Sequence, residues 1–193
     1  MKLTANFTLD ELVKSQTAIR KGINNMPNPD QIENLKALAT NILQPVRSNF
    51  DKPLIISSGF RCAELCIAIG GSIKSQHERG EAADFEIWGT SNEKLAEWIK
   101  SELEYDQLIL EFWNEDNPNS GWVHCSYSRD HNRNESLIAY KDKMKKHSTN
   151  HGYKTRNPIA KLLPQFKQLI IRNKKKYTRK LKHGKKKLTE LYK

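Results

Sequence analysis

The chain has 193 residues, of which 37% are hydrophobic and 28% are charged, as in an ordinary globular protein. This length allows one well-packed domain with an extension and excludes two full-sized domains. No apolar run approaches the ~20 residues that cross a bilayer, and no apolar segment typical of a signal peptide follows the N-terminus, so we predict neither feature.

The net charge of +11 conceals a division along the chain. Residues 1–138 carry 14 Lys and Arg against 20 Asp and Glu, whereas residues 139–193 carry 19 against 2. We therefore predict an acidic domain over residues 1–138 and a basic tail over residues 139–193. We expect this tail to be disordered or partly helical, with an amphipathic stretch at 158–172.

The predicted elements begin with a short helix at residues 8–14. A longer helix should start at Asn28-Pro29, because asparagine is a favourable N-cap and proline suits the first helical position. Apolar residues then recur at helical spacing and form one stripe. Pro45 should end or kink this helix, because it lacks an amide hydrogen and clashes with the preceding turn.

Further along the chain, the hydrophobic pattern predicts four strands and two helices. The strands are expected at 53–58, 82–88, 106–112 and 121–127. The helices are expected at 63–69, before Gly70-Gly71, and from a capping box of Thr90 and Glu93 to about residue 102. The elements do not alternate regularly, so we predict an α+β fold with a small, mainly antiparallel sheet and flanking helices.

Three cysteines occur at positions 62, 66 and 125. An odd number without a signal peptide indicates reduced thiols rather than a disulfide framework. Cys62 and Cys66 are one helical turn apart, but the third cysteine is distant in sequence, so a cysteine metal site is the less favoured interpretation. Cys125 should point away from its neighbour His124, because side chains alternate along a strand.

Three other residues have the type and setting of metal ligands. His77 lies in a loop before a predicted strand, Asp84 lies within that strand, and His124 lies in a later strand. A catalytic zinc takes three imidazole or carboxylate ligands and keeps one position for water. A histidine in a strand is more often an ordinary surface or hydrogen-bonded residue, but an aspartate in an apolar strand is costly unless it is paired. These three residues are therefore a candidate zinc site, and the ordinary interpretation of each residue stays open on spacing alone.

The motifs around these residues resemble a known family. Residues 57–62 read SSGFRC, residues 72–87 read SIKSQHERGEAADFEI, and residues 121–127 read GWVHCSY. They resemble the zinc D-alanyl-D-alanine carboxypeptidase family, which includes phage L-alanoyl-D-glutamate endolysins and shares its fold with the hedgehog signalling domain. The matched positions are Ser75 and His77, then Gly80, Ala82 and Asp84, then Trp122 and His124. The resemblance covers roughly residues 5–130 and implies a hedgehog-like zinc peptidase fold.

The resemblance also implies catalytic residues. Many members carry the catalytic acid three residues before the distal histidine, where this chain has Gly121. We therefore expect the general base to be Glu111, at the end of the strand that should form a hairpin with the strand of His124; Glu115 and Asp116 are alternatives. If no acid reaches the site, it could bind zinc without turnover. The resemblance implies that Arg61 anchors substrate or stabilises an oxyanion, while a surface ion pair is the simpler alternative.

The favoured function is a zinc peptidase that cleaves peptidoglycan stem peptides with a metal-activated water, at a D-Ala–D-Ala or L-Ala–D-Glu type of bond. The alternatives are a zinc-binding recognition module of the cell wall without turnover, and a nucleic-acid-binding protein whose tail dominates. The tail could contact an anionic cell-wall polymer, nucleic acid or anionic lipid. We expect a monomer that is made in the cytoplasm, acts on the cell wall, and could come from a phage.

Overall fold

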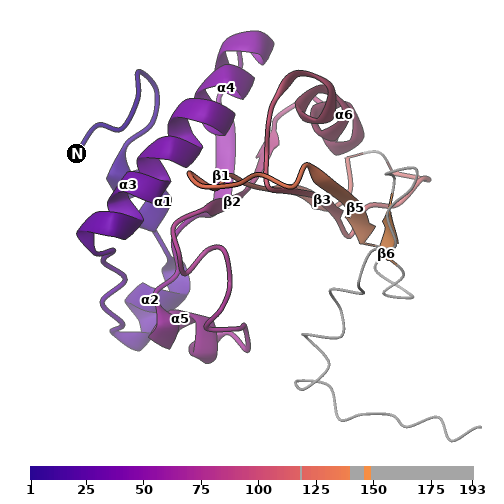
Figure 1. The fold of residues 1–193 in the computed structure, drawn as a ribbon. Coiled ribbons are helices and arrows are strands. Elements are labelled where there is room, and N and C mark those ends of the chain that lie inside the picture. Colours follow the sequence, from indigo (N-terminus) through magenta and orange to yellow (C-terminus); the bar gives the residue numbers. More distant parts are fainter. Residues whose placement is uncertain (118, 140–145, 149–193) are drawn as a thin grey trace, which may run out of the picture. The chain divides into compact units, whose positions relative to one another are not determined.

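The structure is a computed structural model that describes residues 1–117, 119–139 and 146–148 (Figure 1). All of the described residues belong to one compact unit, residues 1–156. Most of the basic tail lies outside the described residues, including the amphipathic stretch at 158–172. The predicted domain boundary at residue 138 therefore stays a prediction, although a strand of the sheet continues to Ala139.

Helices make up the N-terminal third of the unit. They are α1 (Leu9–Val13), α2 (Gln16–Lys21), α3 (Pro29–Leu38), a π-helical turn η1 (Ala39–Leu43) and α4 (Gln44–Phe50). The predicted start of α3 is confirmed: Asn28 is the N-cap, Pro29 follows it, and Asn28 and Gln31 form a reciprocal capping box. Helix α2 was not predicted from the sequence.

Of the two predicted effects of Pro45, to end or to kink the long helix, the first does not occur. The chain stays helical to Phe50, and the irregularity is the π-helical turn η1 directly before α4. Proline is tolerated here because it occupies the first turn of α4, where its missing amide hydrogen is least costly. The wider turn, which is typical of such insertions, accommodates the ring within a continuing helix.

The sheet has six strands in the order β1-β2-β4-β3-β5-β6. The strands are β1 (Leu54–Ser58), β2 (Ala82–Ile87), β3 (Gln107–Glu111), β4 (Trp122–Ser126), β5 (Glu135–Ala139) and β6 (Lys146–Ser148). Among the strands of the described residues, β3 and β5 pair in parallel, and the other four pairs are antiparallel. The α+β fold with a mainly antiparallel sheet is therefore confirmed, while β5 and β6 extend it beyond the four predicted strands.

Two more helices join these strands: α5 (Ala63–Ala68) follows β1, and α6 (Asn92–Glu102) follows β2. The predicted cap of α6 was wrong by one residue. Ser91 rather than Thr90 is the N-cap, and its side chain accepts a hydrogen bond from the Lys94 amide. Adjacent Ser and Thr are both good caps, and the Thr90 hydroxyl lies 3.4 Å from the Lys52 amine instead.

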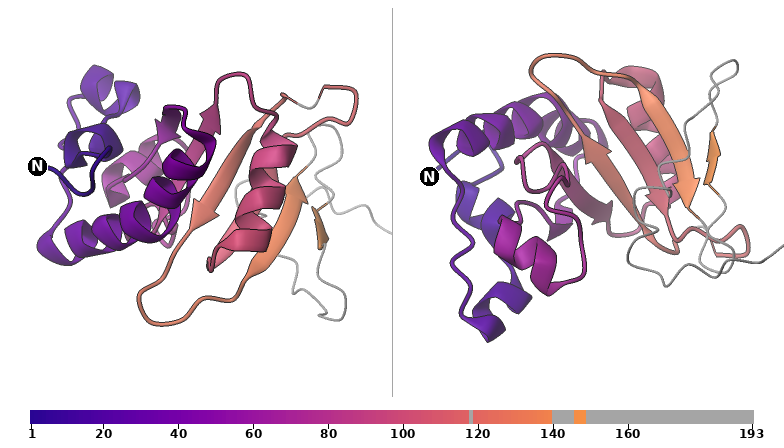
Figure 2. Two further views of the ribbon diagram at one scale, coloured as in Figure 1. Left: turned by 90° about the horizontal axis from the view of Figure 1, so that it is seen from above. Right: turned by 60° about the horizontal axis from the view of Figure 1, so that its bottom comes forward.

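The two faces of the sheet have different surroundings. Alternate residues of β2, β3 and β4, such as Phe85, Leu110 and Val123, belong to the main hydrophobic core together with residues of α1, α3, α4 and α6. Helices α3, α4 and α6 lie on this side of the strands in Figure 1, and from the opposite side the strands lie in front of α6 (Figure 2, right). Among the described residues, no helix combines the length and hydropathy needed to cross a membrane.

Candidate functional site

Three ligating atoms from distant parts of the chain converge on the face of the sheet opposite the main core. Asp84 of β2 and His124 of β4 are direct register partners, and His77 lies in the loop between α5 and β2. Asp84 Oδ1 is 2.8 Å from His124 Nδ1 and 3.2 Å from His77 Nε2, and the two imidazole nitrogens are 3.3 Å apart. The fold thus brings together the three residues that the sequence singled out.

A backbone carbonyl orients the ring of His77. Its Nδ1 lies 2.7 Å from the carbonyl oxygen of Gly59, which can only accept a hydrogen bond. Nδ1 therefore carries the proton, and Nε2 presents its lone pair to Asp84 and His124. This arrangement of an imidazole between a fixed acceptor and a cation site is typical of metal-binding histidines.

Burial sets the charges of these groups. Burial lowers the pKa of His77, which is only 2% exposed, so this imidazole is neutral at pH 7. Burial alone would raise the pKa of Asp84, but its close contacts with the two imidazoles outweigh burial and hold that pKa well below its usual range. A neutral imidazole and an ionised carboxylate are the forms that bind a divalent cation.

Two imidazole nitrogens and one carboxylate oxygen are a donor set found in catalytic zinc sites. All three ligating atoms lie within 4.8 Å of one another, and each residue is at least nine-tenths buried. The buried Asp84 carboxylate lies beside the neutral imidazole of His77, and the nearest positive charge, on Arg61 Nη2, is 3.9 Å from Oδ2, so a bound cation would compensate the carboxylate more closely. The residues present therefore fit a divalent metal.

The loop between His77 and Asp84 depends on Gly80. This residue has a φ of +72°, and a Cβ built on it would lie 2.6 Å from the Gln31 carbonyl oxygen of α3. Only glycine can combine this backbone conformation with so close an approach. Gly80, one of the positions matched by the motif resemblance, thus permits a tight backbone path between the two candidate ligands.

Cys125 lies on the other side of the sheet from His124, as predicted. It is fully buried in the main hydrophobic core, and this burial raises the pKa of its thiol far above the usual value. Cys125 is therefore a core residue and not a fourth ligand. Among the described residues, the cluster of possible metal ligands contains no cysteine.

Arg61 approaches the cluster from the segment that follows β1. Its Nη2 is 3.9 Å from Asp84 Oδ2, and its buried Nε has no hydrogen-bond partner among the described residues. The simple surface ion pair is thus not what the structure shows. The guanidinium lies beside the buried carboxylate with donor capacity left for an anionic group.

Arg61 also lines a groove of about 620 Å³ that runs along β1. All five residues of β1 contribute to this groove, and other lining residues come from α1, the start of α2 and the segment between them, including Glu11, Lys14 and Gln16. Because β1 is the first strand in the sheet order, the groove follows an edge of the sheet. It therefore combines strand-edge backbone groups with two basic side chains and one acidic side chain.

Glu111 lies on the same sheet face as the cluster. It pairs with Trp122 across the β3–β4 hairpin, and Trp122 is two residues before His124, so all three side chains point to one side. Diagonal neighbours of this kind have Cα atoms about 7–8 Å apart. The carboxylate of Glu111 can therefore extend toward the space beside His124.

The structure explains why position 121 carries no acid. Gly121 has a φ of +69°, and a Cβ there would overlap the carbonyl oxygen of Glu111. The backbone of Glu111 approaches Gly121 so closely that a side chain is excluded there, while this neighbour on the adjacent strand is itself a glutamate. The carboxylate that the resemblance implies at position 121 is absent from this chain, and the neighbouring residue Glu111 carries a carboxylate.

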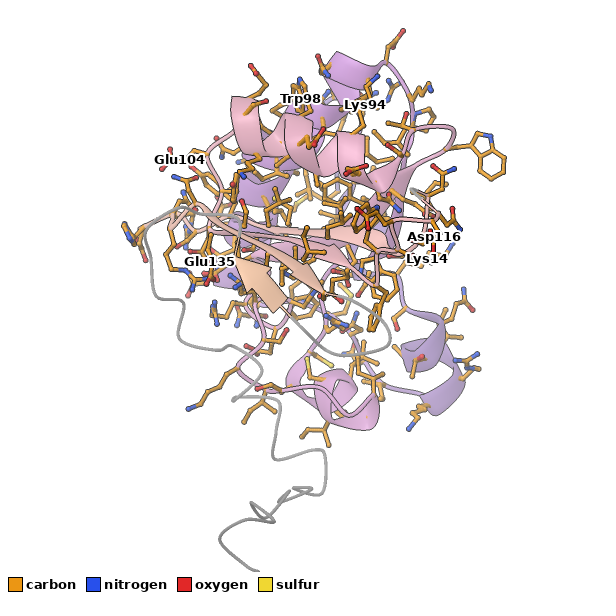
Figure 3. All side chains as sticks on the ribbon, turned by 90° about the vertical axis from the view of Figure 1, so that its right-hand side faces the viewer. Lys14, Lys94, Trp98, Glu104, Asp116 and Glu135 are labelled. Carbon is orange, nitrogen blue, oxygen red and sulfur yellow. The ribbon has the colours of Figure 1, made fainter. Side chains whose placement is uncertain are left out.

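The two alternatives to Glu111 lie in the hairpin loop. Glu115 and Asp116 are exposed, and Figure 3 shows Asp116 toward the opposite end of the sheet from Glu135. Their backbones belong to a turn stabilised by local hydrogen bonds, such as that from the Asp116 amide to the Asn114 side chain. Neither of them has the strand register that directs Glu111 toward the cluster.

Sequence reasoning missed two polar residues beside the cluster. The first is Gln76, whose side-chain oxygen lies 3.4 Å from His124 Nε2. Asp106 was not singled out, although it is 93% buried and contacts Gln76. The available signal was an aspartate at the start of an apolar strand, as for Asp84.

A family model described as Peptidase M15 matches residues 5–126 of the chain. The match includes all three convergent residues, Arg61 and Glu111. A search of curated proteins finds no significant match. Peptidase M15 proteins are zinc-dependent peptidases, and the donor set at His77, Asp84 and His124 fits such a metal. The chain therefore belongs to the peptidase M15 family of metallopeptidases.

Proposed function

We propose that this protein is a zinc peptidase that cleaves stem peptides of peptidoglycan, at a D-Ala–D-Ala or L-Ala–D-Glu type of bond. The observation that supports it most is the convergence of His77, Asp84 and His124 on one point of the sheet face. The proposal assigns these three residues as the zinc ligands. Membership of the peptidase M15 family supports the reaction class, and the choice of bond follows from the motif resemblance.

In this proposal, the chain's own residues divide the work of hydrolysis. A bound zinc ion would supply an acidified water and polarise the scissile carbonyl. Glu111 takes the proton from the attacking water and returns it to the leaving amine, since it lies on the same sheet face as the ligands. Arg61 steadies the negative charge that develops on the carbonyl oxygen.

The groove along β1 supports a peptide substrate. An edge strand can pair through its backbone with an extended peptide, and Arg61 belongs both to this groove and to the surroundings of Asp84. Lys14 and Arg61 favour a chain that carries carboxylates, and the stem peptides of peptidoglycan do. We propose that the substrate lies along this edge, with its scissile bond near the cluster.

The proposal is tested by zinc content and hydrolysis of defined muropeptides. Purified full-length protein should contain about one zinc per chain and should cleave muropeptides with one of the two bond types. Activity should disappear with a chelator and return with zinc. Protein that binds zinc but releases no product from any muropeptide would instead fit a recognition module of the cell wall.

Glu111→Gln and Glu115→Gln form a matched pair for the general base. Both remove one carboxylate charge and keep the side-chain size. Glu111→Gln should retain zinc and lose about 10²- to 10⁴-fold in kcat, because proton transfer is lost. Glu115→Gln should behave as wild type. Full activity of Glu111→Gln would remove it from the mechanism.

A further inference from the structure

Gln76 connects the candidate metal centre to a buried carboxylate. Its Nε2 lies 2.6 Å from Asp106 Oδ2 and 2.8 Å from Ser126 Oγ. Its Oε1 lies 3.4 Å from Nε2 of His124. The side chain thus spans from the start of β3 to the imidazole ring of β4, although Gln76 itself precedes His77 in the loop.

The chemistry of these partners fixes which way the amide points. An ionised carboxylate can only accept hydrogen bonds, so the Gln76 atom beside Asp106 must be the amide nitrogen. The amide oxygen then faces His124, and since this oxygen only accepts, it favours a proton on His124 Nε2. With a cation bound beside Asp84 Oδ1, which lies 2.8 Å from His124 Nδ1, the Nδ1 atom presents its lone pair to that cation and Nε2 carries the proton.

We propose that Gln76 is a positioning residue that selects the tautomer of His124, so that Nδ1 is the metal-binding atom. The proposal depends on the zinc site of the proposed function and adds a determinant of its affinity. The Gly59 carbonyl fixes the tautomer of His77 in the same way, by accepting a hydrogen bond from Nδ1. The two rings therefore use opposite nitrogens, Nε2 of His77 and Nδ1 of His124, and each is held by an acceptor on its far side.

Asp106 holds Gln76 in this orientation because it is itself fixed. Arg133 donates to it through Nε at 2.6 Å and Nη2 at 2.8 Å, a two-pronged contact that is geometrically specific. The Arg133 backbone amide adds a contact at 3.3 Å. The charge of the buried carboxylate is thereby compensated, and the chain of contacts runs from Arg133 through Asp106 and Gln76 to His124.

Outer contacts of this kind are worth about 10- to 100-fold in metal affinity. Gln76→Met keeps the side-chain length and removes both the donor and the acceptor, so it should weaken zinc binding by about 10- to 100-fold in a chelator competition assay. Gln44→Met is the matched control, because Gln44 also makes side-chain hydrogen bonds but to Asn6 and Ser48 on the surface. Its zinc affinity should equal that of wild type.

Arg133→Leu tests the chain from its outer end without touching Gln76. Its zinc affinity should fall by less than that of Gln76→Met, because Asp106 stays in place but loses its fixed orientation. This variant also serves if Gln76→Met fails to fold. Wild-type affinity in a folded Gln76→Met, or in Arg133→Leu if only that variant folds, would overturn the proposal.

Histidine ¹⁵N NMR of the zinc-loaded, full-length protein tests the tautomer itself. His124 should carry its proton on Nε2 in wild type and in Gln44→Met, and should lose this preference in Gln76→Met. Zinc bound through Nε2 of His124, with the proton on Nδ1, would refute the inference and leave the zinc site of the proposed function in place. Because this readout needs no turnover, it separates failure of the positioning proposal from failure of the proposed peptidase function.

Discussion

Substitution of Gly80 gives a quantitative test of the loop that joins His77 to Asp84. Gly80→Ala places a side chain at a φ of +72° and a Cβ 2.6 Å from the Gln31 carbonyl oxygen. The left-handed backbone costs about 1–2 kcal/mol for a residue with a side chain. The contact with a helix backbone adds about 1–3 kcal/mol, the usual cost of overpacking. We therefore expect a loss of about 2–5 kcal/mol in the free energy of unfolding.

Gly22→Ala separates these two contributions. Gly22 has a similar φ of +66°, but a Cβ there meets nothing within 4 Å. This control should lose only the backbone part, about 1–2 kcal/mol. Urea unfolding of the full-length chain in the presence of a chelator measures both variants without the added stability of bound metal. An equal loss in the two variants would refute the steric argument at Gly80.

Three further predictions concern the ligand, the thiols and the N-terminal segment. Asp84→Asn should bind no zinc in metal analysis of the purified protein, since the neutral amide cannot replace the buried carboxylate; a full complement of zinc would contradict its assignment. Alkylation of the folded protein, followed by mass spectrometry, should modify Cys62 first, because Cys66 and Cys125 are buried and burial raises the pKa of both thiols; prior labelling of Cys125 would contradict the core packing. Asn25→Ala should lower the free energy of unfolding by about 2–4 kcal/mol, because the buried side chain makes three hydrogen bonds to backbone groups; a loss below about 0.5 kcal/mol in urea unfolding would contradict this.

The sequence alone predicted those parts of the site that depend on local patterns. His77, Asp84 and His124 have a recognisable residue type and setting, and the strands that carry the last two are apolar runs of typical length. The start of α3 was also predictable, because Asn28, Pro29 and Gln31 are close in sequence and determine the cap among themselves.

Two kinds of feature could not be predicted: contacts between residues distant in sequence, and choices between adjacent residues with nearly equal preference for one position. The contact of Gln76 with Asp106 joins positions 30 residues apart, and its meaning for His124 requires the register of β3 and β4. The cap of α6 was misassigned because Thr90 and Ser91 compete on nearly equal terms. The π-helical turn before Pro45 has no strong local signal, so propensity alone suggested a helix end.

The most direct test of the account is a crystal structure of the full-length protein with zinc, with anomalous scattering recorded at the zinc edge. The account predicts one anomalous peak about 2.0–2.2 Å from His77 Nε2, Asp84 Oδ1 and His124 Nδ1. A zinc-loaded crystal with no peak between these three atoms, or with a peak that one of the three residues does not contact, would contradict it.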